Sequence, residues 1–176
     1  MNNKKFFTYS GEMRVTKVAS LIQSMENTEI TENDEIILFL YVTDGYLEAA
    51  DMISNFLKKL PNLITIITLG KVHSAGSIFL LQMMDYAKIE VTMSSSLMLK
   101  GATPIKNNRI KYFIKTYITK DESYINKGER IARVNKRIYD LAKKSDMPKD
   151  KLKEFADTGQ TFLSNEEMKK LFFGGF

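Results

Sequence analysis

One short segment of the sequence combines a nucleophilic side chain with small flanking residues. It is Gly70-Lys71-Val72-His73-Ser74-Ala75-Gly76-Ser77, and it follows the apolar, β-rich run 63–69. A serine where a strand gives way to a helix can be exposed at the helix N-terminus, where free N–H groups and the helix dipole favour developing negative charge. The segment therefore suits acyl transfer with Ser74 as nucleophile, although small residues at a helix start also serve capping and packing.

A second glycine break, Asp44-Gly45, follows the apolar run 35–42. Open α/β sheets place their sites at the carboxyl ends of neighbouring strands. We therefore expect the N–H of Gly45 to lie across a crevice from the Ser74 turn.

Composition limits the remaining chemistry. The chain has no Cys and a single His, which excludes disulfides, thiolate metal sites, a cysteine nucleophile and His-rich metal sites. We expect no metal and no cofactor. The one histidine, His73, adjoins the serine, and consecutive side chains at a tight turn point apart, whereas a general base must lie within about 2.6–3.2 Å of its proton donor. We interpret His73 as a polar neighbour at the rim of the site.

The elements that must position these residues alternate along the chain. The patterns predict strands over 6–9, 35–42 and 63–69, each closed by turn residues or glycine, with amphipathic or apolar helices over 15–25, 47–60 and 74–84. This order favours right-handed crossovers and a parallel sheet. Beyond it the sequence predicts short strands over 89–93 and 97–99, a strand or hairpin arm over 110–119, a long helix over 122–144 and a shorter one ending at 155.

The sequence thus predicts one α/β domain over residues 1–176, with a mainly parallel sheet, helices on both faces and a projecting handle at about 105–145. Its basic charge is concentrated, because residues 100–137 carry 11 Lys or Arg against 3 Asp or Glu. We interpret that segment as a solvated or subunit-facing surface and do not expect a nucleic-acid partner. No apolar run approaches the roughly 18 residues that span a bilayer, and no signal peptide is evident, so we expect a soluble cytoplasmic protein and no membrane partner.

The same residues resemble a known family, ClpP, the proteolytic subunit of Clp-type ATP-dependent proteases. Residues 70–77 match the family's Gly-x-x-x-Ser-Met-Gly-Ala motif at both glycines and at Ser74. The family's Asn-Ser-Pro-Gly-Gly loop falls on Tyr41-Val42-Thr43-Asp44-Gly45, which keeps only the last glycine. The resemblance implies that the N–H groups of Gly45 and Ala75 form the oxyanion hole.

The resemblance extends over roughly residues 6–172, since 162–167 is similar to the family's Phe-Leu-Ser-Ala-x-Glu-Ala segment and 122–144 to its handle helix. It implies a ClpP/crotonase-like fold and a serine-type endopeptidase acting on polypeptides. It further implies a homo-oligomeric ring and an AAA+ unfoldase partner.

Two positions depart from the family's catalytic triad. The family's His falls on Lys100, and its Asp falls on Gln160, with Asp157 the nearest carboxylate. A lysine can act as base only when neutral, which burial achieves by lowering its pKa, and Ser-Lys hydrolases exist. The sequence leaves open a Ser74–Lys100 dyad and a catalytically inactive ring subunit in which Ser74 only caps its helix. A third alternative is the crotonase-type acyl-CoA chemistry of the same fold plan, which uses an oxyanion hole without a serine nucleophile.

Overall fold

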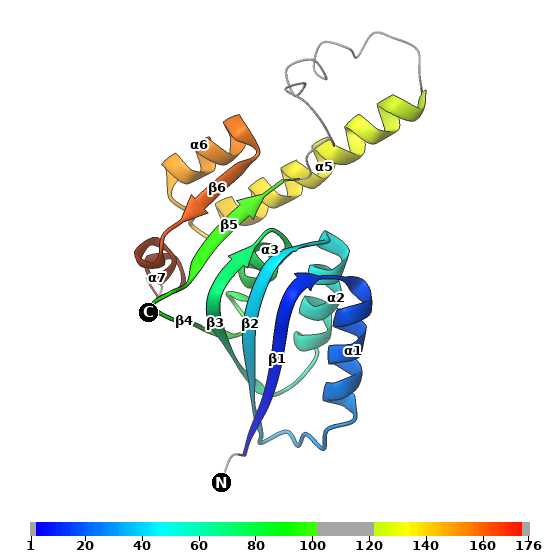
Figure 1. The fold of residues 1–176 in the computed structure, drawn as a ribbon, viewed down its shortest axis with the longest axis vertical. Helices are drawn as coiled ribbons and strands as arrows, with labels where there is room; N and C mark the ends of the chain where they lie inside the picture. The colour runs from blue at the N-terminus through cyan, green and yellow to red at the C-terminus, as the bar shows by residue number, and fades with distance from the viewer. Residues whose placement is uncertain (1–2, 102–121, 174–176) are drawn as a thin grey trace.

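The structure, a computed structural model, describes residues 3–101 and 122–173, and the side chains of 122–128 and 130 are outside this description. It has a mixed α/β fold with a mostly parallel sheet (Figure 1). The elements are, in order, β1 (Lys4–Met13), α1 (Val15–Glu26), β2 (Glu35–Gly45), α2 (Leu47–Leu57), β3 (Leu63–His73), α3 (Ala75–Met83), β4 (Lys88–Val91), β5 (Ser96–Lys100), α5 (Glu122–Lys144), α6 (Lys149–Thr158), β6 (Gln160–Leu163) and α7 (Asn165–Phe173). No helix in the described ranges is long and apolar enough to cross a membrane.

The sheet has the strand order β1-β2-β3-β5-β6, and β4 also pairs with β3. Strands β1 to β5 run parallel to their neighbours, and β6 pairs antiparallel with β5. The predicted alternation of strands and helices is confirmed from β1 to β4, and β5 follows β4 without a helix, as predicted.

Two predicted strand ends are wrong, because both strands extend further than the sequence patterns indicate. β3 continues through Gly70 to His73, and β2 continues to Gly45. Gly70 adopts φ 83°, which a residue without Cβ accepts at little cost, and the β2–β3 register shifts between Leu40 and Val42. Gly70 therefore bends β3 instead of ending it, whereas β2 does end at Gly45, three residues later than predicted. Both strands reach the site.

The prediction of helices on both faces is wrong for strands β1 to β3. Helices α1 and α2 lie on the same side of these strands (Figure 1). Along β1, Phe7 and Tyr9 are buried, whereas Phe6, on the opposite face, is 62% exposed. The cause is topological: the order β1-β2-β3 never reverses, so successive right-handed crossovers place their helices on one face.

The C-terminal part differs from the prediction in two places. β6 and α7 were not predicted, because a four-residue strand and a nine-residue helix give little periodic signal. The long helix α5 is confirmed, but part of its apolar side packs on other elements of the described chain, since Ile138 and Ala142 are buried in the core. The predicted arm over 110–119, and with it much of the handle, lies outside the described residues.

Gly76 allows α3 to lie directly against β2. A Cβ added there would lie 2.6 Å from Val42 Cβ, inside van der Waals contact. We expect Gly76→Ala to lower the free energy of unfolding by about 1–3 kcal/mol, the range of an overpacked core, measured by urea denaturation. The double variant Gly76→Ala with Val42→Ala should lose less than the sum of the single losses. Strict additivity would show that this contact does not limit the packing of α3.

Candidate functional site

Ser74 lies at the junction of β3 and α3 in a strained backbone conformation. Its φ of 53° and ψ of −117° match the first central position of a type II′ turn, where glycine is favoured. Ser74 is 8% exposed, and its hydroxyl makes no hydrogen bond with any described residue. The side chain of Ser74 therefore does not cap α3, which contradicts that part of the inactive-subunit alternative.

The turn around Ser74 is held by its neighbours. Its backbone N–H donates to Met98 O at 2.8 Å, which fixes the turn against β5. The hydroxyl of Ser77 lies 2.6 Å from Ser74 O and 2.9 Å from Met98 O, so it has two acceptors within reach. Ser77 is fully buried and ties both segments together. This role of Ser77 was not predicted, although a serine in the first turn of an apolar helix is a visible signal in the sequence.

The N-terminus of α3 leaves a free donor beside Ser74. Ala75 is 1% exposed, and its N–H has no acceptor among the described residues. Buried N–H groups are rarely left unpaired, and at a helix start they point outward with the positive end of the dipole. The N–H that follows the serine is thus available to an anion.

Gly45 lies at the carboxyl end of β2, next to the end of β3. Val42 and Val72 are the last paired residues of these neighbouring strands, and both strands then lead into site residues. Glycine is required here because a Cβ would lie 2.5 Å from Met13 O of β1. The predicted placement of Gly45 and Ser74 at the same edge of the sheet is confirmed.

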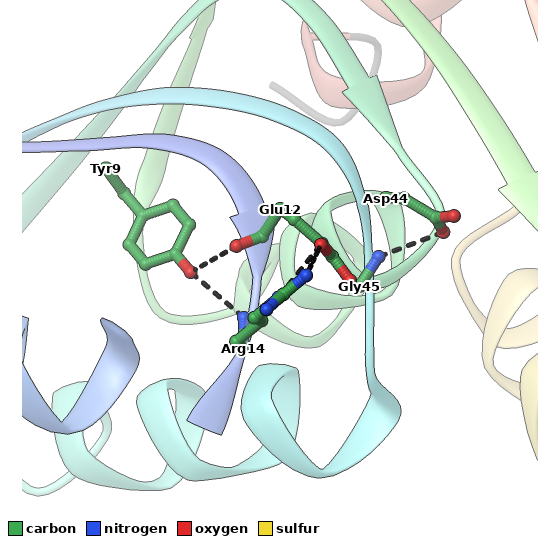
Figure 2. A network of polar contacts seen from close by, with 5 residues as sticks. All are labelled: Tyr9, Glu12, Arg14, Asp44 and Gly45. Atoms are coloured by element: carbon green, nitrogen blue, oxygen red, sulfur yellow. Dashed lines mark hydrogen bonds and ion pairs between the residues drawn. The ribbon is translucent and has the colours of Figure 1, made fainter. Parts of the chain in front are cut away.

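The N–H of Gly45, however, already has an acceptor. It donates to Oδ1 of its own neighbour Asp44 at 2.9 Å (Figure 2). A carboxylate therefore occupies one of the two donors that the resemblance assigns to the oxyanion hole. The sequence shows Asp44 in place of a family glycine but does not show where its side chain lies.

A polar network fixes the end of β1 beside Gly45 (Figure 2). The Tyr9 hydroxyl donates to Glu12 O at 3.0 Å and accepts from the Arg14 N–H at 3.2 Å. Burial raises the pKa of the Tyr9 phenol, so it remains a donor at neutral pH. The guanidinium of Arg14 donates to Glu12 Oε2 through Nε and Nη2, at 2.9 and 2.6 Å. These contacts close the turn from β1 into α1 and keep Met13 against Gly45.

Lys100 and Gln160 are directly opposite each other in the antiparallel β5–β6 pair. Opposite residues in such a pair project to the same face of the sheet, so the two positions that resemble the family's His and Asp are neighbours. Lys100 is partly buried, and its ammonium makes no hydrogen bond or ion pair with a described residue. No hydrogen bond joins Lys100 Nζ to Ser74 Oγ.

His73 lies beside β5 and β6, and its side chain makes no hydrogen bond with Ser74. Its Cα partner is Met98, and its ring packs edge-on against Phe162 with centroids 6.3 Å apart. Burial, followed by the charge of Lys71, lowers the pKa of His73, while Asp44 opposes the shift. The imidazole is therefore neutral at pH 7. Within the described ranges, no group of three or more His, Asp or Glu side chains is placed to hold a metal.

The single histidine makes a clean titration experiment. We expect the His73 ring protons, followed by NMR, to titrate below 6.5, and Asp44→Asn to lower the midpoint further because a favourable charge is removed. The fold favours the neutral ring, so stability should fall as the pH drops below about 6.5 toward the folded-state pKa. Asp85→Asn, whose carboxylate is not among the charges that act on His73, is the control. If the His73 midpoint is the same in Asp44→Asn and in the wild type, the charge of Asp44 does not act on His73.

Comparison with known proteins supports the fold. No protein-family model matches the sequence, and no curated protein is significantly similar to it. Among solved structures, a mutant of ClpP1 from Listeria monocytogenes superposes with a TM-score of 0.57 at 19% identity, over 95% of this chain and 86% of that one. The chain thus has a ClpP-like fold, as the sequence analysis expected.

Proposed function

We propose that this chain is a ClpP-like serine-type peptidase subunit in which Ser74 is the nucleophile. The observation that carries the proposal is the backbone of Ser74, whose φ of 53° and ψ of −117° belong to a glycine-favoured region. Such strain costs about 1–3 kcal/mol and persists where the surroundings enforce it, commonly at catalytic turns. A serine with only a packing role gains nothing from this conformation.

The proposed chemistry is acyl transfer. Ser74 Oγ attacks the carbonyl carbon of a peptide or ester bond, while its proton passes to a neutral base, for which Lys100 is the candidate. The oxyanion of the tetrahedral intermediate accepts from the N–H of Ala75, which has no competing acceptor in the described chain. The base returns the proton to the leaving amine, and water then hydrolyses the acyl-enzyme by the same steps.

Two parts of this machinery must move for it to operate. Lys100 makes no hydrogen bond with Ser74, so the base has to approach when substrate binds, as catalytic contacts often tighten in the complex. The Asp44 carboxylate must leave the Gly45 N–H before Gly45 can serve as the second oxyanion donor.

Those same observations favour a second candidate, a catalytically inactive ClpP-like ring subunit. An aspartate carboxylate on an oxyanion donor repels a developing oxyanion, and the candidate base is disengaged. In this case the strained Ser74 turn is retained by the packing of α3 against β2.

We further propose that the chain forms a homo-oligomeric ring in which the handle, residues 105–145, contributes a contact, with polypeptide as substrate and an AAA+ unfoldase as partner. The open face of β1 to β3 supports assembly, because its apolar side chains are uncovered. Phe6 is 62% exposed and stacks on Phe39 with ring centroids 6.3 Å apart, and Leu63 and Leu69 are 64% and 42% exposed. Light scattering at micromolar concentration tests this point, and a monomer would contradict it.

A fluorophosphonate probe, read by intact mass and peptide mapping, separates the two candidates. The peptidase proposal expects labelling of Ser74, none in Ser74→Ala, and faster labelling as the pH rises and the base loses its proton. Lys100→Ala should slow labelling at least tenfold, whereas Lys71→Ala, an exposed lysine on β3, should leave it unchanged. Wild-type protein that remains unlabelled over a broad pH range, in its oligomeric form, would favour the inactive subunit.

A further inference from the structure

The structure contains a cavity away from the Ser74 turn. A cavity of about 610 Å³ lies where the C-terminal ends of α2, α3 and α5 meet α7. Its volume is within the range of small-molecule sites, roughly 300–1,000 Å³. We propose that this cavity binds an organic phosphate with an aromatic body, of about nucleotide size.

Three lysines from different elements line the cavity, namely Lys58 after α2, Lys144 at the end of α5 and Lys170 on α7. Lysine ammonium groups bind phosphate as point charges, and several of them favour a multiply charged anion. Two acids, Asp85 and Asp146, also line it. The excess of positive charge is therefore small, and the charge available to a ligand depends on which lysines are already paired.

Two of these lysines have no carboxylate partner. Among the described residues, Lys144 Nζ lies 3.4 Å from Asp85 Oδ2, whereas neither Lys58 nor Lys170 forms an ion pair. The ammonium of Lys58 lies 4.4 Å from the centroid of the Tyr86 ring. None of the three donates to a helix carbonyl in the described chain, so capping of the nearby helix ends does not account for them. Burial and then the charge of Lys144 lower the pKa of Lys58, while the charges of Asp85 and Asp51 oppose the shift. A bound anion would relieve the repulsion between the two lysines.

The wall between α2 and α3 is fixed in advance. Gln82, which lines the cavity, donates to Asp51 Oδ1 at 2.7 Å and accepts from Ser54 Oγ. Asp51 in turn accepts two hydrogen bonds from Arg137 of α5, both 2.8 Å long. A preformed wall lowers the ordering cost of binding.

The rest of the lining suits an aromatic body. Tyr86 is 54% exposed, and its ring is already a platform for a cation. The other apolar lining residues are Leu81, Met84, Leu141, Leu171 and Phe172. A ligand that puts its phosphates on the lysines and its ring against this surface uses both halves of the cavity.

Calorimetric titration of the full chain with ATP, tripolyphosphate and adenosine tests the proposal. We expect ATP to bind, tripolyphosphate to bind about tenfold more weakly and adenosine to give no signal at the same concentration. Lys58→Gln should weaken ATP binding about tenfold, and Asp85→Asn should tighten it, because a repelling charge is removed. Lys143 is an exposed lysine at the end of α5, next to Lys144, and does not line the cavity. Lys143→Gln should therefore leave ATP binding unchanged.

The proposal is overturned if neither ATP nor tripolyphosphate binds at about 1 mM, or if Lys143→Gln weakens binding as much as Lys58→Gln. The second result would mean general attraction to a basic surface. Melting curves of each variant show that the fold is intact. Ser74→Ala should bind ATP like the wild type, so this site and the peptidase proposal succeed or fail separately.

Discussion

Ser74→Gly should stabilise the protein while removing its nucleophile. Ser74 has a backbone conformation that costs a residue with a Cβ about 1–3 kcal/mol, and glycine adopts it freely. The added freedom of glycine in the unfolded chain offsets about 0.4–1 kcal/mol of the gain. We expect a net increase of about 1–2 kcal/mol in the free energy of unfolding, together with complete loss of fluorophosphonate labelling.

Ser74→Ala is the matched control for the strain. It removes the same hydroxyl, which makes no hydrogen bond with the described residues, but keeps the Cβ. Its stability in urea should therefore be close to that of the wild type. If Ser74→Gly is no more stable than Ser74→Ala, the turn is not strained, and the observation that carries the peptidase proposal is lost.

Much of the fold could be predicted from the sequence, because the patterns of its strands and helices are local and repeated. The runs that became β2 and β3 are apolar and β-branched, and the helices between them have one apolar side, so crossovers and a parallel sheet follow. The side of the sheet on which the helices lie depends on strand order, which no local pattern encodes. β6 is defined by its pairing with β5, a contact between residues about sixty positions apart, and its four residues carry no period of their own.

Only part of the candidate site could be predicted from the sequence. Ser74 and Gly45 could be placed because each follows a strand of a predicted parallel pair. The positive φ of Ser74 could not, because the turn is held by a contact with a strand distant in sequence, where the Ser74 N–H donates to Met98 O of β5. The Asp44 contact is a side-chain rotamer, which a sequence does not specify, and it changes the expected role of Gly45 from a free donor to an occupied one.

Asp44→Ala should make Ser74 more reactive. In the structure the Asp44 carboxylate accepts from the Gly45 N–H at 2.9 Å and places negative charge where the oxyanion of the proposed reaction would develop. One oxyanion donor contributes about 10²–10³ in rate. Freeing Gly45 should therefore raise the second-order rate of fluorophosphonate labelling by about ten- to a hundredfold. The gain is smaller than the full contribution of one donor, because the Asp44 side chain of the wild type can also move aside and expose the Gly45 N–H.

Asp44→Asn separates charge from occupancy. Its amide oxygen can still accept from Gly45, but the side chain is neutral, so a rate close to that of Asp44→Ala would assign the block to electrostatic repulsion. A rate close to wild type would assign the block to the hydrogen bond. Glu12→Gln, which alters a neighbouring carboxylate that binds Arg14 instead of Gly45, should change little. If Asp44→Ala is labelled no faster than the wild type, the freed Gly45 N–H contributes nothing to the reaction. Asp44 then does not block the site.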